Sequence, residues 1–454
     1  MGHAVIGTQR KRRRWMALAL VVTAQFMVIL DVTIVNVALP SIQRDLGFAQ
    51  ENLQWVITAY TIMFGGTLLL GGRLADLLGR RRLLLVGLAL FSFSSLLCGL
   101  AWSESSLIAF RAVQGLGAAL LVPAALALLL TTFTEGHERN LALGIYGAAA
   151  GSGAAVGVLL GGLLTTYLSW PWIFFVNVPV GSAAIALTPL LLGESRAVLP
   201  HRQFDLAGAF SVTVGLMLLV YALTRATSDG WGATTTLALL ATSVALLLAF
   251  VAIELRSKAP LLPLRIFRLR TLSVANATIA VVGAGAFSEF FLLTLYMQDV
   301  LRFSPVQTGA AFAALALATV VVSNVAQAVV GRVGVRPVLT SGLLALSLSA
   351  ALLSRIPVEG RYFWDLFPAF LLGGLGLGVS FVSAAIGSLT GVRPLDSGVA
   401  SGLVNTSRQI GGAIGLAAIS AVAAASTSSR TVLAVVGAVE HASRIASQSC
   451  EVTD

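Results

Sequence analysis

Charged residues are scarce in this chain, because Asp, Glu, Lys and Arg make up only 11% of its 454 residues while hydrophobic residues make up 57%. Soluble globular proteins carry about 25% charged residues, so this composition excludes a soluble enzyme, a disordered protein and a secreted disulfide-bonded domain. A mean hydropathy of +0.92 over such a length indicates an integral membrane protein with many spans.

Cysteine and histidine are also nearly absent. Two cysteines, Cys98 and Cys450, cannot make a disulfide framework or a four-cysteine zinc site. The four histidines lie in polar segments that are far apart in the sequence. We therefore expect no metal and no other cofactor.

Long apolar runs predict thirteen membrane-spanning helices, because one span needs about 20 mostly apolar residues. The expected spans are 15–39, 53–72, 83–101, 105–132, 140–164, 170–192, 205–224, 233–253, 271–298, 306–330, 337–354, 363–389 and 397–424. The first follows a basic segment, Arg10 to Arg14, and its apolar run is too long for a cleaved signal peptide.

The distribution of basic residues predicts the orientation of the chain. With the N-terminus in the cytoplasm, the inner segments hold 20 Lys and Arg residues and the outer loops hold 5. This bias is typical of multi-pass proteins, and it explains the net charge of +10 without a nucleic-acid partner. Abundant arginine, alanine, leucine and glycine fit a GC-rich bacterium, so we expect a bacterial cytoplasmic membrane.

The C-terminal segment 425–454 departs from the pattern of the preceding spans. Its apolar stretch, Thr431 to Val439, has nine residues, and Glu440 follows it directly. This stretch is too short for an ordinary span. We expect a short amphipathic helix, and the alternative is a chain of thirteen spans with an outer tail.

The loop between the second and third predicted spans reads GGRLADLLGRRR over residues 71–82. It resembles the G-x-L-a-D-x-x-G-R-[RK]-[RK] signature of the major facilitator superfamily of transporters. Gly72 and Gly79 allow close approach or a turn, and Asp76 can interact with a neighbouring helix N-terminus. Arg80 begins a basic run suited to the anionic inner leaflet. The resemblance implies a latch that holds the two halves in one access state, and the alternative is a merely basic turn.

Two further matches lie in the first and fourth spans. Residues 30–40 (LDVTIVNVALP) resemble a stretch typical of the fourteen-span drug:proton antiporter branch, and residues 111–119 (RAVQGLGAA) match its R-x-x-Q-G-x-G-A-A pattern. Asp31 is 16 residues past Trp15, about 24 Å along a helix, so it is expected in the outer half within reach of Arg111. The resemblance implies that this arginine takes part in proton coupling. The alternative for Asp31 is a structural aspartate satisfied by Thr33, Asn36 or an arginine. The alternative for Arg111 is a salt bridge that only holds the first and fourth spans together.

Other ionisable and polar residues within the spans are candidates for proton coupling or cargo binding. Glu289 lies 18 residues into the ninth span, among phenylalanines. A carboxyl group in apolar surroundings can carry a proton reversibly, and the alternative is a solvated glutamate in an outer vestibule. Arg408, Gln114 and Tyr60 are expected to line the substrate cavity, with backbone binding as the alternative for Arg408 and packing or lipid contact as the alternative for Tyr60.

Glycines recur at intervals of four residues in the fifth span. Gly153, Gly157 and Gly161 share one helix face, which permits close packing, and Gly162 follows them. Residues 157–162 resemble the antiporter motif G-P-x-x-G-G, except that Val158 replaces the proline. We therefore expect close packing without the proline kink. The missing proline weakens the prediction of antiport relative to uptake or facilitated transport. The alternative is that these glycines serve helix packing only and have no bearing on the direction of transport.

The resemblance covers residues 15 to about 424 and implies an all-α major facilitator fold, with two six-span bundles, two extra central spans and a short or degenerate last span. The expected parts are a basic tail (1–14), an N-terminal bundle (15–193), two linker spans (194–258), a C-terminal bundle (259–424) and a degenerate end (425–454). A degraded copy of the signature loop at 331–337 fits an internal repeat.

These matches imply a proton-coupled exporter of lipophilic drugs or antibiotics that works by alternating access. Its expected partners are a lipophilic small molecule, protons and the lipid bilayer, and we expect a monomer. The alternative is a facilitator of a lipid, amino acid or metabolite without proton antiport. An enzyme is not expected, because every predicted loop is short and no catalytic cluster is visible. ATP-driven pumping is not expected either, because the G-x-x-x-x-G-K-[ST] loop is missing.

Overall fold

The computed structural model of the chain describes residues 2–49, 52–133, 137–195, 205–257, 260–357, 360–392 and 397–426. Nearly all of these residues are helical, and no strand occurs among them. Within this part of the chain, nine helices are long and apolar enough to span a membrane, and three shorter apolar helices accompany them. Each of the thirteen expected spans overlaps a described helix. The expected amphipathic helix after residue 426 lies outside the described residues.

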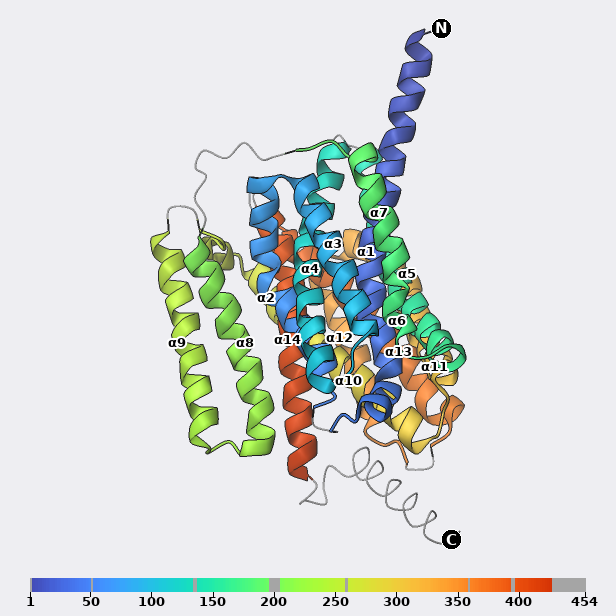
Figure 1. Cartoon of the computed structure of the whole chain (residues 1–454), viewed down its shortest axis with the longest axis vertical. Helices are drawn as coiled ribbons and strands as arrows, with labels where there is room; N and C mark the ends of the chain where they lie inside the picture. The colour runs from blue at the N-terminus through green and yellow to red at the C-terminus, as the bar shows by residue number, and fades with distance from the viewer. Residues whose placement is uncertain are drawn as a thin grey trace.

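The first half of the fold is a bundle of seven helices, in which α6 and α7 together form the sixth span. Their bounds are α1 Gly2–Leu46, α2 Trp55–Leu78, α3 Arg80–Gly99, α4 Glu104–Thr132, α5 His137–Tyr167, α6 Trp172–Phe175 and α7 Asn177–Leu191. In this bundle α4 packs against α2 and α3, and α1 packs against α5. Figure 1 shows the first turns of α1 projecting beyond the bundle, so the basic tail expected at 1–14 continues the first span as one helix.

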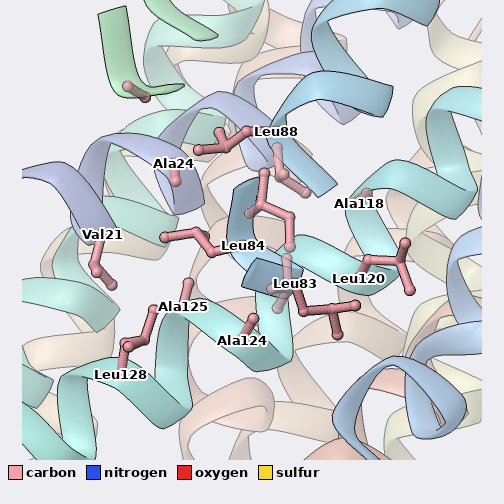
Figure 2. Packing of buried hydrophobic residues seen from close by; sticks show 14 of the residues in the cluster. Val21, Ala24, Leu83, Leu84, Leu88, Ala118, Leu120, Ala124, Ala125 and Leu128 are labelled. Carbon is pink, nitrogen blue, oxygen red and sulfur yellow. The ribbon is translucent and has the colours of Figure 1, made fainter. Parts of the chain in front are cut away.

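Small and branched apolar side chains fill the centre of this half. Figure 2 shows Val21 and Ala24 of α1 facing leucines of α3 and alanines of α4, including Leu84 and Ala125. Alanine and glycine let the α4 backbone approach its neighbours closely, as is usual where helices pack within a membrane. Gly117, for example, lies so close to the α3 backbone at Phe91 that an added Cβ would be 2.7 Å from its nitrogen.

The second half repeats this arrangement with five long helices. They are α10 Arg270–Leu295, α11 Pro305–Val333, α12 Val335–Leu353, α13 Phe367–Leu389 and α14 Ser397–Ser426, with π-helical turns at Tyr296–Val300 and Tyr362–Leu366. α10 packs against α14, and α13 packs against α11 and α12. The rings of Phe290, Phe312 and Phe370 stack in series, with centroids 4.8 and 5.4 Å apart, and join α10, α11 and α13.

Two further helices form a hairpin between the halves, α8 Leu206–Asp229 and α9 Thr234–Arg256. Figure 1 shows this hairpin on one side of the molecule, beside α2 and α14. Thr213 of α8 donates a hydrogen bond to the carbonyl oxygen of Gly66 on α2 at 2.9 Å. Val220 packs with Ala413 and Ala417 of α14 in an apolar cluster. The boundaries expected at 193/194 and 258/259 fall between α7 and α8 and shortly after α9.

The two halves meet along α5 with α11 and along α2 with α14. We call the end of the bundle at which α1 finishes, and at which α2, α4 and α11 begin, the distal end. Leu39 and Ile42 of α1 pack there with Leu295 of α10 in one apolar cluster, and Gln298 donates a hydrogen bond to the Val37 carbonyl oxygen at 2.7 Å. The bundle is therefore closed at its distal end.

Candidate functional site

The first half contains a buried ion pair between α1 and α4. Nη1 of Arg111 lies 2.6 Å from Oδ2 of Asp31, and both side chains are almost completely buried, with 1% and 0% of their surfaces exposed. The α4 helix begins with a reciprocal capping box between Ser103 and Ser106, which fixes its start two turns before the arginine. The local sequence thus sets the depth of Arg111, and the packing of α1 brings Asp31 to it.

Two side-chain amides complete the hydrogen bonding of the Asp31 carboxylate. Nε2 of Gln114 donates to Oδ1 at 2.8 Å, and Nδ2 of Asn177 donates to the same oxygen at 3.1 Å. Asn177 opens α7 and also donates to Ser95 Oγ of α3 at 3.1 Å. Together with Arg111, these amides make three hydrogen-bond donors, from α4 and α7, around the carboxylate on α1. Buried charges need such compensation, because leaving them unpaired in an apolar interior is costly.

Arg111 has further partners besides the aspartate. Its Nε donates to the Val56 carbonyl oxygen at 2.9 Å, and Nη1 donates to Oε1 of Gln114 at 2.7 Å. The guanidinium carbon lies 4.3 Å from the ring centroid of Tyr60 and 5.7 Å from that of Phe174. The arginine would therefore keep a hydrogen bond on α2, another on α4 and an aromatic face if the aspartate lost its charge.

The structure pairs Asp31 with Arg111, as their expected depths suggested, but it places two predicted cavity residues differently. Gln114 is fully buried within the ion-pair network, and Tyr60 is 1% exposed with its ring beneath the arginine. Neither side chain lines an open cavity in this conformation, because the network and the packing of α2 on α4 enclose them. The Tyr60 hydroxyl has no hydrogen-bond partner among the described residues.

The other two ionisable candidates lie in the second half, away from this pair. Glu289 of α10 points toward α13, where its Oε1 is 3.6 Å from the place a Cβ on Gly373 would occupy. That oxygen is buried and has no hydrogen-bond partner in the described part of the chain. Arg408 of α14 is partly exposed, and its guanidinium carbon lies 6.0 Å from the Phe381 ring centroid. The structure does not join Glu289 to the Asp31 network.

The glycines of α5 lie where helices come closest. Added Cβ atoms at Gly153, Gly157 and Gly161 would each meet α1, at Gly161 only 2.7 Å from the Ile34 carbonyl oxygen. Gly162 instead faces the second half, where its Cβ would be 2.5 Å from the Pro305 carbonyl oxygen of α11. Val158 is buried, and α5 is one continuous helix through this position.

The loop with the family signature binds the segment that directly follows α7. Gly79 has φ +113°, a conformation that favours glycine, and it separates α2 from α3. Beyond it, the backbone N–H of Arg81 donates to Glu194 Oε1 at 3.1 Å, and Glu194 Oε2 lies 3.9 and 3.8 Å from Nε of Arg81 and Arg82.

The structure describes fewer contacts for the other predicted members of this loop. The Arg80 backbone N–H donates to the Ser195 carbonyl oxygen at 3.0 Å. Gly72 meets only Pro123 of α4, at an ordinary contact distance of 3.6 Å. Asp76 lies in α2, but its side chain, and with it the predicted contact to a helix N-terminus, is outside the described part of the structure. All of these described contacts lie within the first half.

Two residues of these sites were not singled out from the sequence. Asn177 lies within the expected span 170–192, and an amide within an apolar span was the available signal. Glu194 is an acidic residue just past the sixth span, and nothing in its neighbours indicated that it would bind the α2–α3 loop. Among the described residues, no group of three or more His, Cys, Asp or Glu side chains could hold a metal ion.

Known proteins similar to this chain are membrane transporters. Residues 21–416 match the Major Facilitator Superfamily. The puromycin resistance protein pur8 of Streptomyces alboniger is 43% identical over 418 residues, which cover 91% of this chain and 83% of that protein. The cephamycin export protein CmcT of Amycolatopsis lactamdurans is 42% identical over 415 residues, which cover 91% of this chain and 85% of that protein.

Solved structures agree with this assignment at the level of the fold. A peptide transporter POT in complex with sulfate superposes with a TM-score of 0.67 at 16% identity, over 96% of this chain and 94% of that one. The α-helical membrane architecture, the sequence match over residues 21–416 and the two relatives above lead to one conclusion. The chain belongs to the major facilitator superfamily, and its resistance and export relatives fit the drug-efflux branch of that family.

Proposed function

We propose that this transporter exports lipophilic drugs or antibiotics in exchange for protons, and that Asp31 binds the proton. The relatives named for resistance and export support the cargo class. The buried pair of Asp31 and Arg111 is the observation that carries the coupling proposal. A carboxylate within a membrane span that is paired with an arginine is costly to maintain, and such residues commonly mark proton pathways.

The geometry suggests what protonation would change. A proton on Asp31 removes its charge and weakens its hydrogen bonds with Arg111, Gln114 and Asn177. Arg111 keeps its bonds to α2 and α4, so the change mainly loosens α1 from α4 and α7. α1 also contacts the second half at its distal end through the hydrogen bond from Gln298. Protonation of Asp31 would in this way affect the contact between the two halves.

The basic N-terminal segment, expected in the cytoplasm, puts the distal end on the outside of the cell. A bundle closed at its distal end then corresponds to the state that loads cargo from the cytoplasm, with Asp31 charged. In a rocking-bundle cycle, the halves would tilt to open the outside, cargo would leave, and a proton entering from outside would neutralise Asp31. Proton release to the cytoplasm would restore the paired state. We propose that Glu289 carries a second proton and that the transporter acts as a monomer.

The direct test is transport by the purified full-length protein in liposomes with an imposed pH gradient. Internal pH is recorded while lipophilic anions, lipophilic cations and neutral antibiotics are added in turn. We expect cargo-induced proton movement by the unchanged protein and none by Asp31→Asn. The matched control is Asp229→Asn, the same substitution at the exposed end of α8. Normal proton-driven efflux by Asp31→Asn would exclude this aspartate from the coupling path.

The second candidate is a facilitator that moves a small molecule down its own gradient. Val158 supports it, because α5 is continuous at the position where the antiporter motif has proline. This function predicts flux of labelled cargo without a pH gradient and without proton movement. It also predicts equal rates for Asp31→Asn and the unchanged protein, in direct contrast to proton antiport.

A further inference from the structure

We infer that Arg408 is the cargo-binding cation between the two halves, and that it selects cargo with an anionic group over cationic cargo. This inference rests on the proposed export function and specifies its substrate class. Its argument begins with the position of the arginine on α14.

The contacts of α14 define the direction in which Arg408 points. Gly411 and Gly415 pack on the α10 backbone at Ala280 and Ala284, and Gln409 packs on α2 at Gly65. At 3.6 residues per turn, these contacts put Arg408 between α10 and α2, on the side of α14 opposite α8. Figure 1 shows α8 on the outer side of α14, so Arg408 points away from the α8–α9 hairpin and toward the boundary between the two halves.

One aromatic residue from each half lies near the guanidinium group. Phe381 of α13 presents its ring at 6.0 Å, which is near the limit of a cation–π contact. Tyr60 of α2 is close enough to interact electrostatically with Arg408, and its hydroxyl has no hydrogen-bond partner among the described residues. Gln409 is 1% exposed, and within the same part of the chain neither its Oε1 nor its Nε2 has a partner. Two aromatic rings and two unsatisfied polar groups thus accompany the arginine.

The charge of Arg408 is the feature that decides which cargo can bind. Arg111, whose guanidinium carbon lies 4.3 Å from the Tyr60 ring centroid, is balanced by Asp31. Arg408 has no carboxylate and no hydrogen-bond acceptor among the described residues, and it remains partly exposed. Glu289 lies beside Gly373 instead. Arg408 is therefore an uncompensated positive charge at the boundary between the halves, where a cationic cargo would be repelled and a carboxylate could form a bidentate pair.

Two xanthene dyes of similar size test this selection, the anion fluorescein and the cation rhodamine 123. Binding to the purified full-length protein is measured by fluorescence polarisation, and transport is measured in proteoliposomes. We expect tighter binding of fluorescein than of rhodamine 123. Arg408→Gln should weaken fluorescein binding by about 10- to 100-fold, the loss expected for a charge-assisted hydrogen bond, and should not weaken rhodamine 123 binding.

Two further variants complete the test. Arg408→Lys keeps the charge and should retain the preference for fluorescein. Arg336→Gln removes an exposed arginine from α12 and should leave both affinities unchanged. Equal or tighter binding of rhodamine 123 by the unchanged protein would overturn the inference. So would an equal loss for both dyes in Arg408→Gln, or no measurable binding of fluorescein.

The outcome for the cargo charge is separate from the outcome for proton coupling. If fluorescein moves in an Arg408-dependent way without any proton movement, the charge selection stands and proton antiport fails. If protons move with rhodamine 123 but fluorescein is neither bound nor transported, antiport stands and the charge selection fails.

Discussion

Neighbouring glycines in α5 face different halves of the molecule, and this difference predicts the effect of adding a single methyl group. In Gly162→Ala the new Cβ would lie 2.5 Å from the Pro305 carbonyl oxygen and 2.9 Å from the Val306 Cα, both on α11. Real Cβ atoms keep at least about 3 Å from such atoms, so α5 and α11 would have to separate. The clash involves backbone atoms, which cannot turn aside as a flexible side chain can.

The size of this effect follows from the usual cost of overpacking, about 1–3 kcal/mol. Here that cost applies only to the conformation closed at the distal end, because the clash lies between the halves. A conformer with the distal end open escapes it. We therefore expect the ratio of closed to open molecules to fall by about 5- to 150-fold in Gly162→Ala, while each half stays folded.

Double electron–electron resonance measures this ratio directly. Spin labels are placed at Ser105 and Arg355, exposed positions at the distal ends of the two halves, with Cys450 replaced by serine. We expect a population of longer distances in Gly162→Ala. The matched control is Gly161→Ala, whose Cβ would lie 2.7 Å from the Ile34 carbonyl oxygen within the first half. It should lower thermal stability without lengthening the distance.

Two results would refute this reasoning. The distance distribution of Gly162→Ala could match that of the unchanged protein, which would mean that the α5–α11 contact does not hold the distal end closed. Gly161→Ala could lengthen the distance equally, which would mean that the methyl group acts through the first half alone.

Three further predictions concern single polar groups. Asn177→Ala removes one of the three donors to the Asp31 carboxylate and should lower the free energy of unfolding by about 0.5–1.5 kcal/mol, measured by thermal denaturation in detergent; unchanged stability would contradict the hydrogen bond. Glu194→Gln loses only long, partly exposed ion pairs, so the expected loss in the same assay is below about 1 kcal/mol and should disappear in 1 M salt. A large loss that persists in salt would show that the contact is not mainly electrostatic. Glu289→Gln should fold normally because Oε1 of Glu289 has no hydrogen-bond partner among the described residues, and it should reduce the number of protons moved per cargo molecule in proteoliposomes. An unchanged ratio would exclude Glu289 as a proton carrier.

The sequence predicts the helices well because a membrane constrains them strongly. An apolar run of about 20 residues has few structures open to it in a bilayer, so each expected span overlaps a described helix. The pair of Asp31 and Arg111 was also within reach of prediction, since distance along a helix gives depth and two opposite charges at one depth attract each other.

The partners of that pair were not predictable in the same way. Gln114 was expected in a cavity, yet it binds Asp31, because which side of α4 faces α1 depends on how the whole bundle rotates and packs. Asn177 reaches the carboxylate only because α7 packs against α1 and α3. Glu194 binds a loop more than a hundred residues earlier in the chain, and no periodicity encodes such a contact.

The α8–α9 hairpin makes contacts of different kinds with the two halves. One directional contact, the hydrogen bond from Thr213, is with α2 of the first half. Toward α14 the hairpin packs Val220 against the small side chains Ala413 and Ala417, and apolar contacts of this kind are non-directional. In the proposed rocking cycle, the hairpin would therefore move with the first half while α14 slides along it. The side of the transporter beside α2 and α14 would then stay covered throughout the cycle.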